Sequence, residues 1–184
     1  MTIYLGLDSA TEYLSLALWS PDTGILTYRS PHLGRTHTHR IVPELEALFN
    51  EAGCVPRNLS GIGVGIGPGS YTGLRVGLAT AKGLARGLNL PLAGCDTLEA
   101  LAASDLAEGE TVYATLDARR GNVYAGIYRL ENGVVATLRS PKKIAKDGLK
   151  TSTSSLRIIE ARAPDAGYIA RRARAGRTAE ALYL

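Results

Sequence analysis

The stretch from Gly61 to Gly87, which reads GIGVGIGPGSYTGLRVGLATAKGLARG, has the clearest chemical potential in the chain. An apolar strand with alternating glycines turns at Pro68-Gly69 and leads into a helix, whose first turn has unpaired backbone N–H groups. Such a turn can bind an anion, and Ser70 is placed to act as the N-cap of the helix. The stretch matches neither nucleotide fingerprint, because Thr72 stands where the phosphate loop and the dinucleotide motif each require a glycine.

The helix that follows this turn has small residues along one side. Gly73, Gly77 and Ala81 are four residues apart and therefore share one face. Because a glycine inside a helix costs about 1 kcal/mol relative to alanine, this pattern favours the close approach of another backbone. Two interpretations stay open: close packing within the chain, or a seam that meets a partner protein.

Metal and thiol chemistry have little support in the sequence. The three histidines, His32, His37 and His39, precede the first expected helix, and no third ligand stands near them, so loop or capping roles are favoured. Cys54 and Cys95 match no metal or redox spacing and are expected to be buried thiols in a reducing compartment. We therefore predict no metal site.

The charge of the chain is distributed unevenly. Residues 1–110 have a net charge of −4 and residues 111–184 a net charge of +8. A basic half can bind phosphate backbones or an acidic partner, although its arginines also suit the solvated face of a helix. Met1 leads directly into an apolar strand without a leader-like pattern, and no stretch approaches the roughly 18 apolar residues that span a bilayer. We expect a cytoplasmic protein without a membrane association.

Alternation and helical spacing predict the order βββαβαβα over the first 107 residues. Asp22-Thr23-Gly24 marks the turn between the second and third strands, and Asp96 or Thr97 could cap the last helix. The expected strands are 3–7, 13–19, 25–28, the glycine-rich strand from 61 and 92–95, and the expected helices are 39–52, the glycine-rich helix from 70 and 98–107.

The beginning of this pattern recurs later in the chain. Leu7-Asp8 is echoed by Leu116-Asp117, and Gly24-Ile25-Leu26 by Gly133-Val134-Val135, with the same offset. Chance similarity between short hairpins is the alternative to a true repeat. We predict an α/β fold of the actin-like or ribonuclease-H-like type with duplicated βββαβα lobes, one covering residues 1–108 and a reduced second lobe covering residues 109–184.

Five segments carry a resemblance to a known family. They are GLDSATEYLSLAL, HTHRIVPELEALFNEAG, GIGPGSYTGLRVGLATAKGLA, LPLAGCDTLEALA and LDARRGNVYAGIY. In this order they resemble the bacterial tRNA threonylcarbamoyladenosine biosynthesis (TsaB) family over about residues 1–130, with a weaker match at Ala181 to Leu184. The resemblance implies a member of the actin-like ATPase superfamily that is not itself catalytic. It also implies that the chain pairs with a threonylcarbamoyl transferase subunit in a complex with a small ATPase, which modifies the adenosine next to the anticodon of tRNA.

The resemblance also indicates which chemistry is missing. The catalytic relatives carry a His-x-x-x-His metal pair just after the strand that follows the glycine-rich helix, where this chain has Thr97 and Leu101. We therefore predict no catalytic residues, no bound metal and no cofactor, and we expect Glu99 to be a solvated helix residue. In the actin-like superfamily the first hairpin approaches the nucleotide phosphates, and we expect weak nucleotide binding or none. The candidate anion- or nucleotide-binding residues are Asp8, Ser9, Thr11, Ser70, Arg119 and Arg120.

The predicted partner surface combines the small-residue seam with the preceding helix. Arg75 and Lys82 are expected at its polar rim, and a large residue in the seam, as in Gly77→Leu, is expected to weaken pairing. The same surface would form a homodimer when the chain is alone, and contact with tRNA would be indirect. The predicted interface residues are Val42, Leu45, Phe49, Gly73, Arg75, Gly77, Ala81 and Lys82. The alternative functions are a metal-dependent glycopeptidase-like enzyme and an actin-like ATP-binding enzyme.

Overall fold

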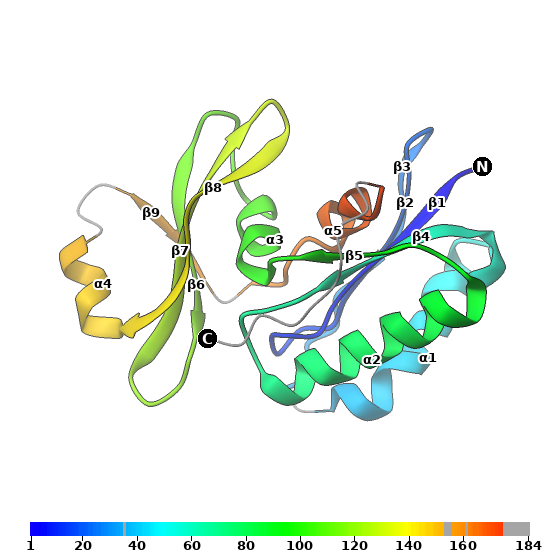
Figure 1. Cartoon of the computed structure of the whole chain (residues 1–184), viewed down its shortest axis with the longest axis horizontal. Helices are drawn as coiled ribbons and strands as arrows, with labels where there is room; N and C mark the ends of the chain where they lie inside the picture. Colours follow the sequence, from blue (N-terminus) through cyan, green and yellow to red (C-terminus); the bar gives the residue numbers. More distant parts are fainter. Residues whose placement is uncertain (35, 153–155, 161, 175–184) are drawn as a thin grey trace.

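The computed structural model describes residues 1–34, 36–152, 156–160 and 162–174, and the side chains of 150–152 are not among the parts described. The chain forms two β-sheets, and helices α3 and α5 lie between them (Figure 1). None of the helices in these ranges is both long and apolar enough to cross a bilayer.

The first sheet has the strand order β3-β2-β1-β4-β5. Strands β1 to β3 form an antiparallel meander, and β4 and β5 then add in parallel on the far side of β1. This order confirms the predicted actin-like, ribonuclease-H-like arrangement. The strands are β1 (Ile3–Asp8), β2 (Ser15–Ser20), β3 (Gly24–Arg29), β4 (Leu59–Gly65) and β5 (Leu92–Cys95).

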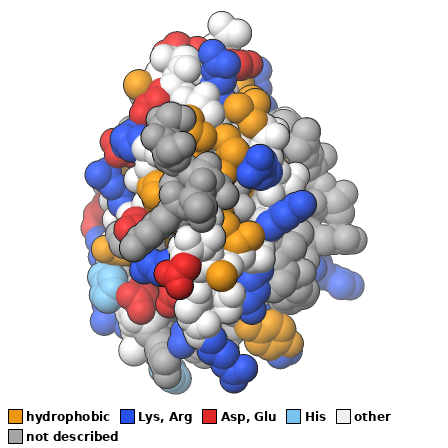
Figure 2. Space-filling view, turned by 90° about the vertical axis from the view of Figure 1, so that its left-hand side faces the viewer, with side chains coloured by type: hydrophobic (Ala, Val, Ile, Leu, Met, Phe, Trp, Pro, Cys, Tyr) orange, Lys and Arg blue, Asp and Glu red, His pale blue; other side chains and the backbone are white. Residues whose placement is uncertain are grey.

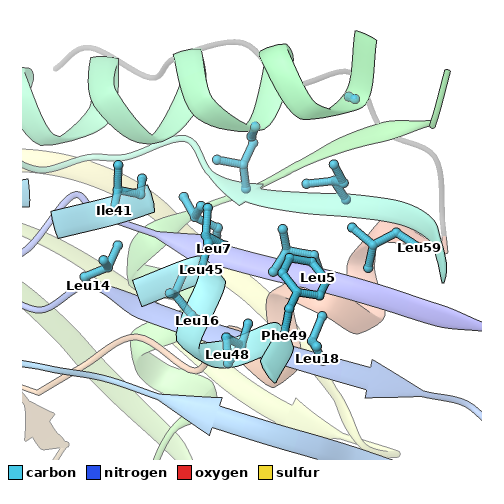
Figure 3. Packing of buried hydrophobic residues seen from close by; sticks show 14 of the residues in the cluster. Leu5, Leu7, Leu14, Leu16, Leu18, Ile41, Leu45, Leu48, Phe49 and Leu59 are labelled. Atoms are coloured by element: carbon cyan, nitrogen blue, oxygen red, sulfur yellow. The ribbon is translucent and has the colours of Figure 1, made fainter. Parts of the chain in front are cut away.

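Helices α1 (His37–Glu51) and α2 (Tyr71–Leu88) cover one face of the first sheet, and a short 3-10 turn (Pro56–Asn58) precedes β4 (Figure 1). Successive side chains of a strand face opposite sides, so leucines at alternate positions of β1 and β2 share one face of the sheet. This face packs against α1. Figure 3 shows this main hydrophobic core at close range. Its labelled members are Leu5, Leu7, Leu14, Leu16, Leu18, Ile41, Leu45, Leu48, Phe49 and Leu59.

The second sheet has the order β8-β7-β6-β9. Helix α3 (Thr97–Ala103) packs on the face toward the first sheet, and α4 (Lys146–Ser152) packs on the opposite face (Figure 1). Figure 2 shows the outer side of this half of the molecule, where charged side chains of both signs alternate with hydrophobic ones. The strands are β6 (Thr111–Asp117), β7 (Asn122–Glu131), β8 (Val134–Ala145) and β9 (Arg157–Ile159).

Helix α5 (Ala166–Ala173) returns to the first sheet and packs on the face that α1 and α2 leave open. Two glycines allow this contact. A Cβ on Gly6 would lie 1.9 Å from the carbonyl oxygen of Ala166, and a Cβ on Gly63 would lie 2.2 Å from that of Ile169. Gly63 of β4 is therefore explained by a helix more than a hundred residues later in the chain, whereas its neighbours Gly61 and Gly65 face Tyr4 and Asp8.

The predicted repeat has a structural counterpart. Each first hairpin begins with an aspartate whose Oδ1 accepts the backbone N–H two residues later: Asp8 from Ala10 and Asp117 from Arg119, both at 2.8 Å. Gly24 and Gly133 precede the third strand of each unit with positive φ values of 83° and 72°. The two units thus share their first hairpins, as the common offset predicts.

Several element bounds differ from the predicted ones. Helix α1 begins two residues earlier than expected, and α3 ends at Ala103 with Ser104 as its C-cap, four residues before the predicted end. The weak family match at residues 181–184 lies outside the described residues. The division at residues 108 and 109 stays a prediction, since α5 from the second part of the chain packs on the first sheet.

Candidate functional site

A buried aspartate lies where the turn after β1 meets the first turns of α2 and α3. Asp8 is fully buried, and its Oδ2 accepts a hydrogen bond of 2.7 Å from the hydroxyl of Thr97. Thr97 Oγ1 in turn accepts the backbone N–H of Gly67 at 3.1 Å. A Cβ on Gly65 would lie 1.8 Å from Asp8 Oδ2, so β4 needs a glycine beside this carboxyl group.

Burial controls the protonation of Asp8. Burial raises the pKa of Asp8 from 3.8 to about 6, although the hydrogen bonds from the Ala10 backbone and the Thr97 hydroxyl act in the opposite direction. Both carboxylate oxygens already have partners within the chain. The arrangement joins β1, β4 and α3, and Asp8 thus has a structural role in addition to its predicted place at a nucleotide site.

The other candidate anion-binding residues of the first hairpin also have partners within the chain. Ser9 Oγ donates to the carbonyl oxygen of Gly73 at 2.8 Å, and the Ser70 backbone N–H donates to the carbonyl oxygen of Ala10 at 2.7 Å. Ser70 Oγ accepts from Gly73 N–H at 3.3 Å, which confirms its predicted N-cap role. Thr11 Oγ1 pairs with the backbone of Tyr13. The main chain of the hairpin therefore lies against the N-terminus of α2 and accepts one of its N–H groups.

The remaining candidates, Arg119 and Arg120, lie on a different part of the molecule. Both are exposed on the turn between β6 and β7, at the bottom of the second sheet in Figure 1. Within the described residues, no hydrogen bond or ion pair joins either arginine to Asp8, Ser9 or Ser70. The six predicted residues thus form two separate groups.

The small-residue seam of α2 faces inward. A Cβ on Gly73 would lie 2.0 Å from the carbonyl oxygen of Ser9, a Cβ on Gly77 would lie 2.2 Å from Ser9 Oγ, and Ala81 is fully buried. The partner of this face is therefore the chain's own β1–β2 turn. Of the two interpretations, the structure supports close packing within the chain. The prediction that the seam of Gly73, Gly77 and Ala81 forms an outer surface is therefore wrong.

The predicted residues of α1 divide between core and surface. Leu45 and Phe49 are 6% and 5% exposed and belong to the main core (Figure 3). Val42 is 55% exposed. Helical spacing does not account for this exposure, because Val42 lies three residues before Leu45 and seven before Phe49, on nearly the same face of the helix.

The outward face of α2 has a shallow pocket. It is lined by the predicted rim residue Arg75 and by four residues that the sequence analysis missed, Tyr71, Thr72, Val76 and Ala79. The Arg75 guanidinium lies 5.4 Å from the ring centre of Tyr71 and donates to its hydroxyl at 3.4 Å. Lys82, one of the predicted rim residues, is exposed on the same helix. Helical spacing from the inward Gly73 and Gly77 would have identified these outer positions.

The junction between the two sheets contains a buried polar cluster. Glu99, for which the sequence predicts a solvated position, is 7% exposed, and its Oε1 accepts a hydrogen bond of 2.6 Å from Tyr168 OH. Arg172 Nε lies 3.7 Å from the same oxygen. Asp96 caps α3 through the N–H of Leu98 and lies 3.4 Å from Tyr128 OH. These contacts join α3 to α5 and to the second sheet.

The positions that correspond to the metal pair of the catalytic relatives are used for structure. Thr97 links Asp8 to Gly67, and Leu101 is fully buried in the core between α3 and the second sheet. His32 contacts Glu12 at 3.1 Å, and His37 contacts the Tyr13 carbonyl oxygen at 3.2 Å. In the part of the chain that the structure describes, no group of three or more His, Cys, Asp or Glu is arranged to hold a metal ion.

Comparison with known proteins gives consistent matches. A family model described as "TsaD: tRNA N6-adenosine threonylcarbamoyltransferase" matches residues 31–160. The tRNA threonylcarbamoyladenosine biosynthesis protein TsaB of Bacillus subtilis is 40% identical over 135 residues, which are 73% of this chain and 58% of that protein. TsaB of Escherichia coli is 39% identical over 133 residues, 71% of this chain and 57% of that protein. The chain thus spans less than three fifths of the length of these curated relatives.

A solved structure covers the whole fold. YeaZ from Pseudomonas aeruginosa superposes with a TM-score of 0.84 and 26% sequence identity, over 100% of both chains. The family model covers residues 31–160, and the curated relatives are about 40% identical over more than two thirds of this chain. The chain therefore belongs to the family of tRNA N6-adenosine threonylcarbamoyltransferase proteins and, within it, to the TsaB proteins.

Proposed function

We propose that this chain acts in the biosynthesis of threonylcarbamoyladenosine in tRNA, as a subunit that pairs with a threonylcarbamoyl transferase and does not itself catalyse the transfer. The names of its curated relatives support the pathway. A small ATPase is the expected third member of the complex, and the cytoplasm is its expected location. The chain needs no metal or cofactor of its own in this role.

The non-catalytic assignment rests on the structural roles of Thr97 and Leu101. A catalytic metal site needs ligands that point into an accessible space with an open coordination position. Here the Thr97 hydroxyl is fully buried and holds Asp8, and the Leu101 side chain fills a hydrophobic core. Both side chains therefore stabilise the fold. Histidine side chains at these two positions would not fit without rearrangement of the surrounding residues.

The outer surface of α2 supports the proposed pairing. We define the outer helix surface as Tyr71, Thr72, Arg75, Val76, Ala79 and Lys82 on α2. It has a shallow apolar centre at Val76 and Ala79, with Arg75 and Lys82 at its edge. An apolar centre with a polar rim is the usual organisation of a protein interface. A second copy of the chain could occupy the same surface when the transferase is absent.

A charge placed in the centre of this surface tests the pairing. Ala79 is exposed, so Ala79→Glu leaves the core intact but places a carboxylate in the apolar centre. We expect the affinity for the transferase subunit to fall by roughly ten-fold or more, because a buried unpaired charge is costly. Size-exclusion chromatography with light scattering, followed by calorimetric titration, measures the complex and its affinity.

A matched control separates this effect from the added charge itself. Gly87 is exposed on the same helix, and a side chain there would meet no atom within 4 Å. Gly87→Glu should therefore bind the transferase as the unchanged chain does. Gly77→Leu is unsuitable as a test, because its side chain would collide with Ser9 and damage the fold. Equal affinities for Ala79→Glu and the unchanged chain would contradict the outer helix surface as the interface.

Activity measurements test the non-catalytic assignment separately. The transferase subunit should modify tRNA faster when this chain is added, whereas the chain alone should give no product. Transfer by the purified chain alone would contradict the proposal. Tight ATP binding by the isolated chain would favour the actin-like ATP-binding alternative, which the internal pairing of the first hairpin disfavours.

A further inference from the structure

The turn between β6 and β7 has a backbone conformation that its residues rarely adopt. Arg119, Arg120 and Gly121 follow one another with φ values of 62°, 52° and 73°. Left-handed backbone is unfavourable for residues with a Cβ, and hairpin turns of this kind normally contain Asn or Gly. Two arginines in these positions are therefore not explained by the folding of the turn.

Neighbouring polar groups hold this conformation in place. Asp117 Oδ1 accepts the Arg119 N–H at 2.8 Å. Asn122 Nδ2 donates to the carbonyl oxygens of Arg119 and Arg120 at 3.3 Å and 3.1 Å. The main chain of the turn is thus fixed by Asp117 and Asn122, while both arginine residues remain exposed to solvent. Strained backbone that the surroundings stabilise is typical of functional positions.

Three lysines adjoin the two arginines. Strand β8 pairs with β7 so that Lys143 lies opposite Tyr124 and Lys142 opposite Ala125, and the Lys146 N–H donates to the Gly121 carbonyl oxygen at 2.9 Å. All three lysines are exposed. We call these residues the basic corner, which consists of Arg119, Arg120, Lys142, Lys143 and Lys146.

The basic corner is not neutralised by acidic side chains. Two carboxylates stand close to it in the sequence, Asp117 in the turn and Asp147 in α4, so the local charge stays positive. No ion pair involves a side chain of the basic corner among the residues described. Some exposed arginines elsewhere are paired: Arg157 lies 2.8 Å from Asp105, and Arg171 lies 3.6 Å from Asp165.

The dimensions of the basic corner suit a phosphate backbone. Three residues of β7 lie between the turn and Ala125, the partner of Lys142, which at about 3.3 Å per residue extends the patch over roughly 10 Å. Duplex nucleic acid carries about one negative charge per 1.7 Å of axis, so several phosphates fit along this length. Lys142 and Lys143 point to opposite faces of the sheet because they are consecutive strand residues, and the patch therefore wraps around the corner of the sheet.

An RNA backbone fits the basic corner better than an acidic protein does. Protein interfaces are depleted of lysine and centre on apolar or aromatic residues, whereas three of the five residues of the basic corner are exposed lysines. In Figure 2 several Lys and Arg side chains lie together on the lower part of this outer side of the molecule. The exposed apolar residues of β8, Val134 and Leu138, are nearer to the other end of the strand.

We propose that the basic corner binds the phosphate backbone of the RNA that the complex modifies. The chain would then contact tRNA directly, whereas the family resemblance alone implies contact only through the transferase. This inference deepens the proposed function and rests on it for the identity of the RNA. The positive charge and the fixed turn, however, are properties of the chain itself.

The variant Arg119→Asn/Arg120→Asn tests the proposal. Asparagine tolerates left-handed backbone, so the variant should fold at least as well as the unchanged chain, and its melting temperature should be equal or higher. In fluorescence anisotropy with a labelled tRNA transcript, we expect binding to weaken on the order of ten-fold, because two phosphate contacts are lost. The slope of log affinity against log salt should fall by about 1 to 2.

The variant Arg57→Gln/Arg86→Gln is the charge-matched control. Both arginines are exposed and lie outside the basic corner and the outer helix surface. This control should retain the affinity and the salt slope of the unchanged chain. Equal losses in the two double variants would indicate attraction by net charge alone and would overturn the proposed site, as would undetectable tRNA binding by the unchanged chain.

Two further measurements test for an acidic protein as the ligand and for pairing with the transferase. A poly-aspartate peptide that binds the basic corner while tRNA does not would overturn the RNA assignment in favour of an acidic protein. Pairing with the transferase is measured on the same variants. If the chain pairs with the transferase but Arg119→Asn/Arg120→Asn binds tRNA as the unchanged chain does, only the proposed RNA site fails. If the chain binds tRNA through the basic corner but does not pair with the transferase, the proposed function fails and the basic corner is still supported.

Discussion

At the scale of single residues, Asp96 shows how the junction between the sheets is built. Its Oδ1 caps α3 by accepting the N–H groups of Leu98 and Glu99 at 2.7 Å and 3.2 Å. Burial, followed by the nearby Glu99 carboxylate, raises the pKa of Asp96 from 3.8 to about 7, although the backbone hydrogen bonds and Tyr128 act against this. The cap is therefore a carboxyl group that takes up a proton near neutral pH.

This pKa predicts how the stability of the chain depends on pH. The folded state holds the proton of Asp96 more strongly than the unfolded state does. The stabilising contribution of this proton to the free energy of unfolding is therefore fully present below about pH 4 and is lost as the pH rises to about 7. Asp96→Asn keeps an N-capping side chain but removes the titration. The variant should gain stability relative to the unchanged chain between pH 5 and pH 8, by about 2–3 kcal/mol.

Urea unfolding at both pH values measures this difference. Asp22→Asn, in the exposed turn between β2 and β3, serves as the control for the removal of one carboxylate. A constant difference between Asp96→Asn and the unchanged chain from pH 5 to pH 8 would show that Asp96 does not titrate in this range.

At the scale of elements, the first sheet is covered on both faces by helices with different requirements. On one face, leucines of the strands pack against α1 and α2 in a core of ordinary side chains (Figure 3). On the other face, Gly6 and Gly63 let the backbone of α5 approach the strands directly. A single methyl group on that second face is therefore more damaging than one on the surface of a helix.

The pair Gly63→Ala and Gly83→Ala tests this difference. The Cβ of Gly63→Ala would lie 2.2 Å from the Ile169 carbonyl oxygen, so α5 must shift. We expect the free energy of unfolding to fall by roughly 1–3 kcal/mol. Gly83 is exposed in α2 with no atom within 4 Å of its added Cβ, and Gly83→Ala should increase stability by about 0.5–1 kcal/mol. Denaturant unfolding of both variants provides the values, and equal changes would refute the close contact.

At the scale of the whole molecule, α5 and α3 join the two sheets. The Asp165 N–H donates to the Ala100 carbonyl oxygen at 2.9 Å, and Tyr168 OH donates to the buried Glu99 at 2.6 Å. The Ile169 side chain belongs to the core on the second-sheet side, while its backbone lies on Gly63 of the first sheet. The two sheets should therefore unfold together.

Tyr168→Phe tests this cooperativity. The variant removes the hydrogen bond to Glu99 and leaves its buried side chain with the ion pair to Arg172 at 3.7 Å, which should cost about 1.5–3 kcal/mol. Fluorescence of Trp19, the single tryptophan, reports on the first sheet, and hydrogen exchange of β7 reports on the second. Both transitions should move to lower denaturant concentration by the same amount. Separate transitions would show that the sheets unfold independently.

Much of this architecture could be predicted from local patterns. The order of the first sheet follows from alternating strands and helical spacing, and the repeat is visible in Leu7-Asp8 and Leu116-Asp117. Spacing also identifies the small-residue face of α2. It does not identify the segment that packs against this face. Gly73 and Gly77 meet Ser9, more than sixty residues earlier, and Gly63 meets Ile169, more than a hundred later. Such contacts depend on the assembled fold.

The position of α5 has a consequence for synthesis on the ribosome. The strands and helices of the first sheet are complete at about residue 103, but the face formed by Gly6 and Gly63 stays uncovered until Ala166–Ala173 has been translated. At 5–20 residues per second, this interval lasts roughly 3–13 s. During that time the nascent chain exposes an apolar sheet face, which makes it a natural client for chaperones that bind emerging polypeptides.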